Sequence, residues 1–77
     1  MTLRINGEDR EFPGALTLAA LVESLGMKGD RVAVELNLEI VARDRWAATE
    51  LHDGDRLEIV HFVGGGRHEP RNALKDL

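Results

Sequence analysis

DGDRLEIVHFVGGG, residues 53–66, places a turn, a strand and three glycines directly after one another. Asp53-Gly54-Asp55 has the composition of a tight turn. Residues 56–63 combine alternating and continuous apolar positions, which indicates a strand. Gly64, Gly65 and Gly66 then interrupt the pattern, because glycine adopts conformations that are closed to other residues. We therefore expect the folded domain to end near Val63.

The glycine run alone fits two interpretations. It is a flexible linker, or it is a narrow tip that enters a channel and places a carboxyl group in another protein's active site. A phosphate-binding loop would require a following helix start and commonly a Lys-Ser/Thr signature, and Arg67-His68-Glu69-Pro70 supplies neither. Independent nucleotide binding is therefore not expected.

Upstream of residue 53, the sequence predicts a hairpin followed by a helix. Leu3 and Ile5 alternate with polar residues, and Asn6-Gly7 is a strong signal for a hairpin turn. The partner strand, residues 8–12, is stopped by Pro13-Gly14. Thr17 then stands at a helix N-cap position. The helix has one apolar face and a C-cap glycine, formed by Leu18, Leu21, Val22, Leu25 and Gly26.

The middle of the chain predicts a second set of strands. Residues 32–38 are rich in β-branched and apolar types, which favours a strand. Residues 37–39 either continue it or turn toward Ile40 and Val41, and residues 43–49 are expected to form a short helical turn that carries Trp46. One helix on one face of a mixed sheet of about four to five strands is an α+β domain of the β-grasp type. In that arrangement the last strand is central, and the glycines leave from its end.

The composition excludes several functional classes. The 77 residues suffice for one small domain, with 43% apolar and 31% charged residues and no apolar run near the roughly 20 residues that cross a membrane. The net charge of -4 argues against nucleic-acid or anionic-membrane binding. Cysteine is absent, which fits the cytosol. His52, His61 and His68 are too widely spaced for a known ligand pattern, so no metal site is expected.

Charge and composition change after the glycines. Residues 1–66 contain seven basic and twelve acidic side chains, whereas residues 67–77 contain three and two. The last segment also has no aromatic or β-branched residue, so we expect it to be disordered unless a partner orders it. The predicted division is a β-grasp domain at 1–63, a flexible glycine tail at 64–66 and an extension at 67–77.

Several short motifs together resemble the ThiS family of sulfur carriers in thiamin biosynthesis, which are ubiquitin-like relatives of MoaD. The matching features span residues 1–66 and are Asn6-Gly7, Val34-Glu35-Leu36-Asn37, Val41-Ala42-Arg43-Asp44-Arg45-Trp46, Asp53-Gly54-Asp55 and the final glycine pair. The asparagine-bearing strand and the arginine-rich turn with tryptophan favour ThiS over MoaD.

The resemblance implies a role for the end of the chain. A ThiF-like adenylyltransferase would use ATP to adenylate the carboxyl group of Gly66, and a sulfur donor would convert it to a thiocarboxylate. A ThiG-like thiazole synthase would then receive the sulfur, with Gly64 and Gly65 giving access to its site. The protein itself would be no enzyme and would bind no cofactor. Residues 67–77 depart from the usual ending, because they block the carboxyl group of Gly66. One hypothesis is that a peptidase removes them; others are a nonstandard gene context and a fused downstream domain.

Two alternatives share the same expected fold. One is a sulfur carrier for another pathway that is activated by removal of the extension, and the other is a ubiquitin-like modifier that joins Gly66 to an amine. Fold does not separate them, because fold and chemistry are only loosely linked.

Partner contacts are expected next to the tail. His61, Phe62 and Val63 are the candidate docking residues, and His61 alternates to the opposite face from Phe62. Leu57 and Ile59 are assigned to packing, and Trp46 to a core or edge anchor. A wider acidic docking face toward a basic activating enzyme could comprise Glu35, Glu39, Asp53, Asp55 and Glu58.

Overall fold

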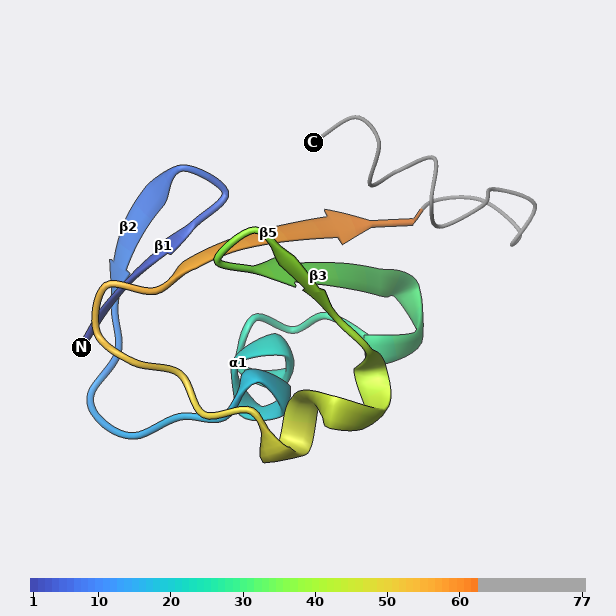
Figure 1. The fold of residues 1–77 in the computed structure, drawn as a ribbon, viewed down its shortest axis with the longest axis horizontal. Coiled ribbons are helices and arrows are strands. Elements are labelled where there is room, and N and C mark those ends of the chain that lie inside the picture. The colour runs from blue at the N-terminus through green and yellow to red at the C-terminus, as the bar shows by residue number, and fades with distance from the viewer. Residues whose placement is uncertain (63–77) are drawn as a thin grey trace.

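The computed structural model describes residues 1–62, which form a five-stranded mixed sheet with one α-helix on one face (Figure 1). The strands lie in the order β2-β1-β5-β3-β4. The elements are β1 (Thr2–Ile5), β2 (Glu8–Glu11), α1 (Leu18–Ser24), η1 (Gly29–Arg31), β3 (Val32–Leu36), β4 (Glu39–Val41), η2 (Arg43–Ala48) and β5 (Arg56–His61). The expected α+β class, the strand number and the central last strand are confirmed.

Two hairpins build the outer parts of the sheet. In the first, Asn6 and Gly7 have φ values of 52° and 84°, and in the second Asn37 and Leu38 have values of 50° and 73°. Positive φ at both central residues is the geometry of the two-residue turn that matches strand twist. The first turn was predicted from its sequence. The second resolves the open alternative at residues 37–39, because β3 ends at Leu36 and does not continue.

The core lies between α1 and the face of the sheet that α1 covers. Its buried members are Leu3, Ile5, Leu18, Leu21, Val22, Val32, Val34, Trp46, Leu51, Leu57 and Ile59. Trp46 comes from the short helix η2, and its indole N–H donates to the carbonyl oxygen of Val41 at 2.9 Å. The indole therefore ties η2 to β4, as expected for an anchor residue.

Both ends of α1 follow the predicted caps. The hydroxyl of Thr17 accepts a hydrogen bond from the backbone N–H of Ala20 at 3.1 Å. Gly26, with φ 75°, follows Leu25 at the other end and donates its N–H to the carbonyl oxygen of Glu23 at 2.9 Å. A left-handed glycine here satisfies a carbonyl group that the helix leaves free. Among residues 1–62, no helix is long and apolar enough to cross a membrane.

Candidate functional site

Strand β5 leads directly to the glycines and is fixed within the sheet. It pairs in parallel with β1 at Arg4↔Arg56 and Ile5↔Leu57. On its other side it pairs in antiparallel register with β3, from Leu36↔Leu57 to Val32↔His61. The N–H of Phe62 also donates to the carbonyl oxygen of Arg31 at 2.7 Å, one residue beyond the strand. The sheet therefore holds the chain up to Phe62, and Val63 to Gly66 lie outside the described residues.

The side chain of Asn6 continues the pairing of β5 where β1 has ended. Its amide oxygen accepts from the N–H of Ile59 at 2.7 Å, and its amide nitrogen donates to the carbonyl oxygen of Ile59 at 3.1 Å. These two bonds satisfy the N–H and the carbonyl group of Ile59, which the backbone of a longer β1 would otherwise bind. From the sequence, Asn6 was interpreted only as a turn residue, because its partner lies 53 residues away.

Asn37 fastens the second hairpin to the start of β5 in a related way. Its amide oxygen accepts from the N–H of Arg56 at 3.0 Å, and its amide nitrogen donates to Oδ1 of Asp55 at 3.0 Å. Each hairpin turn therefore begins with an asparagine that binds β5 or the turn before it. An asparagine at the first position of two turns is the sequence signal that could have indicated this arrangement.

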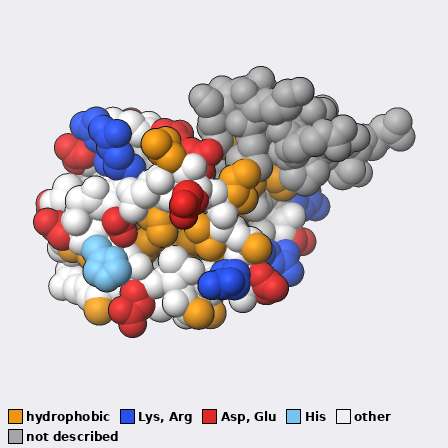
Figure 2. Space-filling model, in the orientation of Figure 1, with side chains coloured by type: hydrophobic (Ala, Val, Ile, Leu, Met, Phe, Trp, Pro, Cys, Tyr) orange, Lys and Arg blue, Asp and Glu red, His pale blue; other side chains and the backbone are white. Residues whose placement is uncertain are grey.

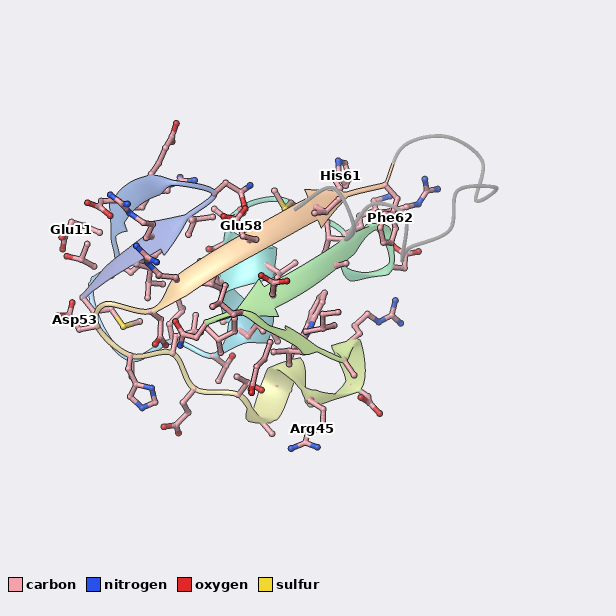
Figure 3. The ribbon with its side chains drawn as sticks, turned by 45° about the horizontal axis from the view of Figure 1, so that its top comes forward. Glu11, Arg45, Asp53, Glu58, His61 and Phe62 are labelled. Atoms are coloured by element: carbon pink, nitrogen blue, oxygen red, sulfur yellow. The ribbon has the colours of Figure 1, made fainter. Side chains whose placement is uncertain are left out.

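Two of the predicted docking residues, His61 and Phe62, lie at the end of β5 that is remote from Asp53 (Figure 3). His61 is exposed and Phe62 is half-buried. Adjacent residues of a strand point to opposite faces, so His61 lies on the side of α1 and Phe62 on the open face, which is the face turned away from α1. Val63, Gly64, Gly65, Gly66 and His68 lie outside the described residues, so their predicted roles stay predictions.

The five acidic residues considered as one docking face are not brought together. The carboxylate of Asp53 accepts from the N–H of Thr2 at 2.6 Å, and that of Asp55 accepts from the N–H of His52 at 2.7 Å, so both stabilise turns. Glu39 is paired with Leu36, whose side chain packs against the core, and so lies on the side of α1. Only Glu35 and Glu58 are direct neighbours, in the β3–β5 register.

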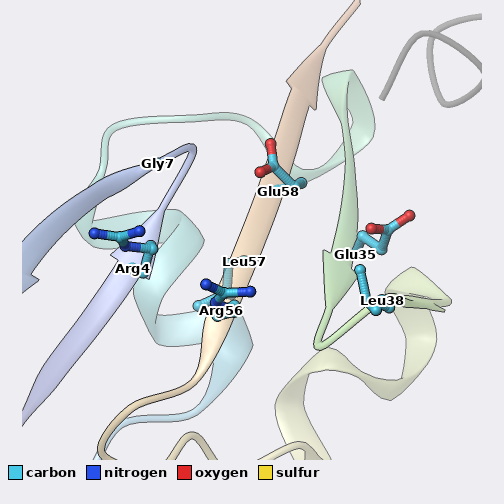
Figure 4. A pocket seen from close by; sticks show the side chains of 7 residues that line it. All are labelled: Arg4, Gly7, Glu35, Leu38, Arg56, Leu57 and Glu58. Carbon is cyan, nitrogen blue, oxygen red and sulfur yellow. The ribbon is translucent and has the colours of Figure 1, made fainter.

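The open face contains a shallow hollow with charges of both signs around it. Its volume is about 230 Å³, and it is lined by Arg4, Gly7, Glu35, Leu38, Arg56, Leu57 and Glu58 (Figure 4). A hydrogen bond to Asp9 at 3.0 Å, together with the charge of Asp9, raises the pKa of the Arg4 guanidinium. In the orientation of Figure 1, acidic and basic side chains are also mixed on the surface of the molecule (Figure 2). Among residues 1–62, no group of three His, Asp or Glu side chains is placed to hold a metal ion.

The sequence of this chain matches a known protein family over the residues that form nearly all of the sheet, the helix and the glycine tail. The model of the ThiS family matches residues 3–66, from β1 to the last glycine. The chain belongs to the ThiS family. This confirms the resemblance on which the sequence interpretation rested, and the matched region covers the helix and all of the sheet except Thr2.

Relatives of two kinds are similar to this ThiS-family chain. The sulfur carrier protein ThiS of Bacillus subtilis is 42% identical over 65 residues, which are 83% of this chain and 98% of that protein. A thiazole synthase of Paramagnetospirillum magneticum is 52% identical over 66 residues, which are 86% of this chain. The chain spans only 20% of that synthase and 22% of a second one, from Magnetococcus marinus. In these synthases, a segment similar to a ThiS protein is thus part of a longer polypeptide.

A solved structure agrees with the fold. The crystal structure of ThiS from Geobacter metallireducens is 36% identical, covers 86% of this chain and 100% of its own, and superposes with a TM-score of 0.74. The mixed sheet with one main helix is therefore the β-grasp fold of this family.

Proposed function

We propose that this chain is a sulfur carrier for thiamin thiazole formation, with the carboxyl group of Gly66 as the point of attachment. Its membership of the ThiS family is the observation that carries the proposal. The path of β5 supports it, because the sheet fixes the chain up to Phe62. The four residues from Val63 to Gly66 then span at most about 14 Å when extended, which is enough to reach into a partner's site.

The chemistry explains why the tail needs partner enzymes. A carboxylate is a poor electrophile, so one of its oxygen atoms first attacks the α-phosphorus of ATP and pyrophosphate leaves. A sulfur nucleophile then attacks the acyl carbon of the adenylate, and AMP leaves. With sulfide as the nucleophile, Gly66 then ends directly in a thiocarboxylate. With a persulfide donor, a second thiol must cleave the acyl disulfide, which releases the thiocarboxylate and leaves a disulfide on the donor. A ThiF-like adenylyltransferase would supply the catalytic groups, with ATP and a sulfur donor as its substrates. The carrier is then a cosubstrate in the cytoplasm and is not itself an enzyme.

A thiazole synthase of the ThiG type is the proposed acceptor of the sulfur. Support comes from the relatives in which a ThiS-like segment and a thiazole synthase share one polypeptide. Covalent joining of two modules keeps them at high effective concentration, which suits successive steps of one reaction. Gly64 and Gly65, which have no side chains, would allow the thiocarboxylate to enter the synthase.

The carboxyl group of Gly66 has to be released before it can be adenylated, because a peptide bond joins it to Arg67. Hydrolysis of the Gly66–Arg67 peptide bond by a peptidase would add water across the bond and leave Gly66 with a free carboxylate. The match to the Magnetococcus marinus synthase covers 73 residues of this chain, so it also extends past Gly66. In that relative too, the segment that matches residues 1–66 is followed by further residues.

Intact mass spectrometry tests the proposal. The chain ending at Gly66 is incubated with ATP, a ThiF-like activator that is competent on its own carrier, and a sulfur donor. We expect a mass gain that equals replacement of one oxygen by sulfur, and no gain for the full-length chain unless it is cleaved. Failure of the shortened chain to react would refute the carrier function, and thiolation of uncleaved chain would refute the assignment of Gly66.

The same incubation distinguishes the two alternatives. Covalent attachment of Gly66 to protein amines would identify a modifier. A thiocarboxylate that a thiazole synthase does not consume, but another sulfur acceptor does, would identify a carrier for a different pathway.

A further inference from the structure

Leu38 occupies a conformation and an environment that are both unfavourable for leucine. Its φ is 73°, in the left-handed region, and its side chain is 86% exposed. The equivalent position of the first hairpin is Gly7, with φ 84°. Glycine is the residue that this turn position favours, because a side chain is strained there. Neither the strain nor the exposure of Leu38 is compensated by packing within residues 1–62, which indicates a contact outside the domain.

Ile40 and two carboxylates extend this feature across the open face. Ile40 is 62% exposed and lies directly opposite Glu35, which in turn lies directly opposite Glu58. Like charges at such a cross-strand pair repel each other. Within the described part of the chain, neither carboxylate forms an ion pair. The row therefore combines exposed apolar surface with two neighbouring carboxylates that form no ion pair within residues 1–62, although Arg4 and Arg56 line the same hollow.

We propose that Leu38, Ile40, Glu35 and Glu58, called the hairpin patch below, form a docking surface for the enzyme that adenylates Gly66. An apolar pocket of that enzyme takes Leu38, and an arginine or lysine of the enzyme lies between the two carboxylates. Charge complementarity is the reason for a cationic partner, because a cation relieves the repulsion between Glu35 and Glu58. This inference rests on the proposed carrier function.

The position of the patch suits an enzyme that also takes the tail. Glu58 and Phe62 lie on the same face of β5, four residues apart, which corresponds to about 13 Å along a strand. A standard interface buries about 800 Å² on each partner and spans more than that distance. Three residues of the patch, Glu35, Leu38 and Glu58, line the hollow of about 230 Å³ together with Arg4, Gly7, Arg56 and Leu57, so the patch has a concave part (Figure 4).

The activating enzyme is a better occupant than the thiazole synthase. In the two relatives from Paramagnetospirillum and Magnetococcus, a ThiS-like segment is already joined to a synthase, so proximity to that synthase comes from the covalent link. An activating enzyme that is a separate polypeptide must instead be found by diffusion. Surface charge complementarity accelerates that kind of encounter.

The test uses substitutions that keep or improve the fold while removing the contact. Leu38→Gly and Leu38→Asn both suit a left-handed turn position. Glu58→Lys places opposite charges across from each other at Glu35, which favours the sheet. Asp44→Lys, in η2, is the matched control because it changes the net charge by the same amount at an exposed position away from the patch.

The chain ending at Gly66 is assayed by ATP–pyrophosphate exchange with the activating enzyme. We expect Leu38→Gly and Glu58→Lys to raise KM at least about tenfold, equivalent to ~1.4 kcal/mol. We also expect kcat to stay within about twofold, which is the signature of lost binding common to ground and transition states. Thermal unfolding midpoints should stay equal or increase. Asp44→Lys should leave KM within about twofold of the unsubstituted chain, well below the change at the patch.

Three other results of these assays would each contradict a different part of the proposal. If the unsubstituted chain exchanges pyrophosphate and the patch variants match it, the docking proposal alone is wrong. If the unsubstituted chain is not activated by a competent enzyme, the carrier function itself fails and the docking proposal fails with it. If activation is normal but sulfur transfer to the thiazole synthase is lost, the patch belongs to the synthase and the assignment to the activator is wrong.

Discussion

Substitution of Asn6 by glycine should destabilise the domain through the loss of two long-range hydrogen bonds. The side-chain amide of Asn6 accepts from the N–H of Ile59 at 2.7 Å and donates to the carbonyl oxygen of Ile59 at 3.1 Å. Both bonds are partly buried, and the side chain of Ile59 is only 6% exposed. Glycine tolerates the φ of 52° at this position, so the substitution removes the bonds without adding backbone strain.

The magnitude follows from the number and burial of these bonds. A hydrogen bond within a protein contributes about 1 kcal/mol net, and an unsatisfied buried partner adds to the loss when one side is removed. Asn6→Gly should therefore lower the free energy of unfolding by about 2 kcal/mol. A domain of this length has a total of roughly 3 to 9 kcal/mol, so the change is a large share of it. Asn6→Ala should cost about 1 kcal/mol more, because alanine is strained at positive φ.

Urea unfolding monitored by tryptophan fluorescence measures the change. Trp46 is the only tryptophan in the sequence and is 5% exposed, so its emission reports on the core. The matched control is Asn37→Gly, which has a similar φ of 50° but forms exposed bonds to Arg56 and Asp55. That control should cost about 1 kcal/mol or less, because water replaces exposed bonds. A loss below about 0.5 kcal/mol for Asn6→Gly, or one no greater than in the control, would refute the reasoning.

Two further substitutions test the remaining local interactions. Thr17→Ala removes the cap that binds the N–H of Ala20 at 3.1 Å and should lower the free energy of unfolding by about 1 kcal/mol, measured in the same urea experiment. An unchanged midpoint there would show that water replaces the cap at no cost. Asp9→Asn removes the ion pair between Asp9, whose side chain is 61% exposed, and Arg4, whose side chain is 46% exposed. Because exposed pairs contribute little, its midpoint should match that of the unsubstituted protein, and a clear decrease would contradict this.

The elements with strong local signals were predictable from the sequence. Asn6-Gly7 sets a turn by its own backbone preferences, and the spacing of Leu18, Leu21 and Leu25 defines a helical face without reference to the rest of the chain. The Asp53-Gly54 turn likewise precedes β5, with Gly54 at φ 89°. These features depend on residues within one turn of each other, which is the range over which a sequence pattern is informative.

The second hairpin and the bonds to β5 were not predictable in the same way. Asn37-Leu38 lacks the glycine that marks such a turn, so the sequence left open whether residues 37–39 continue the strand or turn. The contact between Asn6 and Ile59 joins residues 53 positions apart and depends on the pairing of β1 with β5. Strand order and register are set by packing of the whole sheet, and a local pattern does not contain them.

The candidate site shows the same limit. Alternation along β5 was enough to place His61 and Phe62 on opposite faces. It was not enough to group the acidic residues, because Glu35 and Glu58 are neighbours only through the β3–β5 register. The residue that most favours a docking role, Leu38, looks like part of an apolar strand in the sequence. Its significance appears only when the turn places it in solvent with a positive φ.

The hydrogen-bond partners of β5 change along the strand. The partners at its end determine which residues hold the start of the tail in place. At Leu57 the strand has backbone partners on both sides, and at Ile59 the side chain of Asn6 replaces the β1 backbone. Beyond Ile59, in the described residues, the bonds come from β3 and from the carbonyl oxygen of Arg31, which accepts from Phe62. Loss of the Asn6 bonds should therefore loosen the middle of β5 more than its end. Perturbations at Val32, which pairs with His61, should instead act directly on the root of the tail.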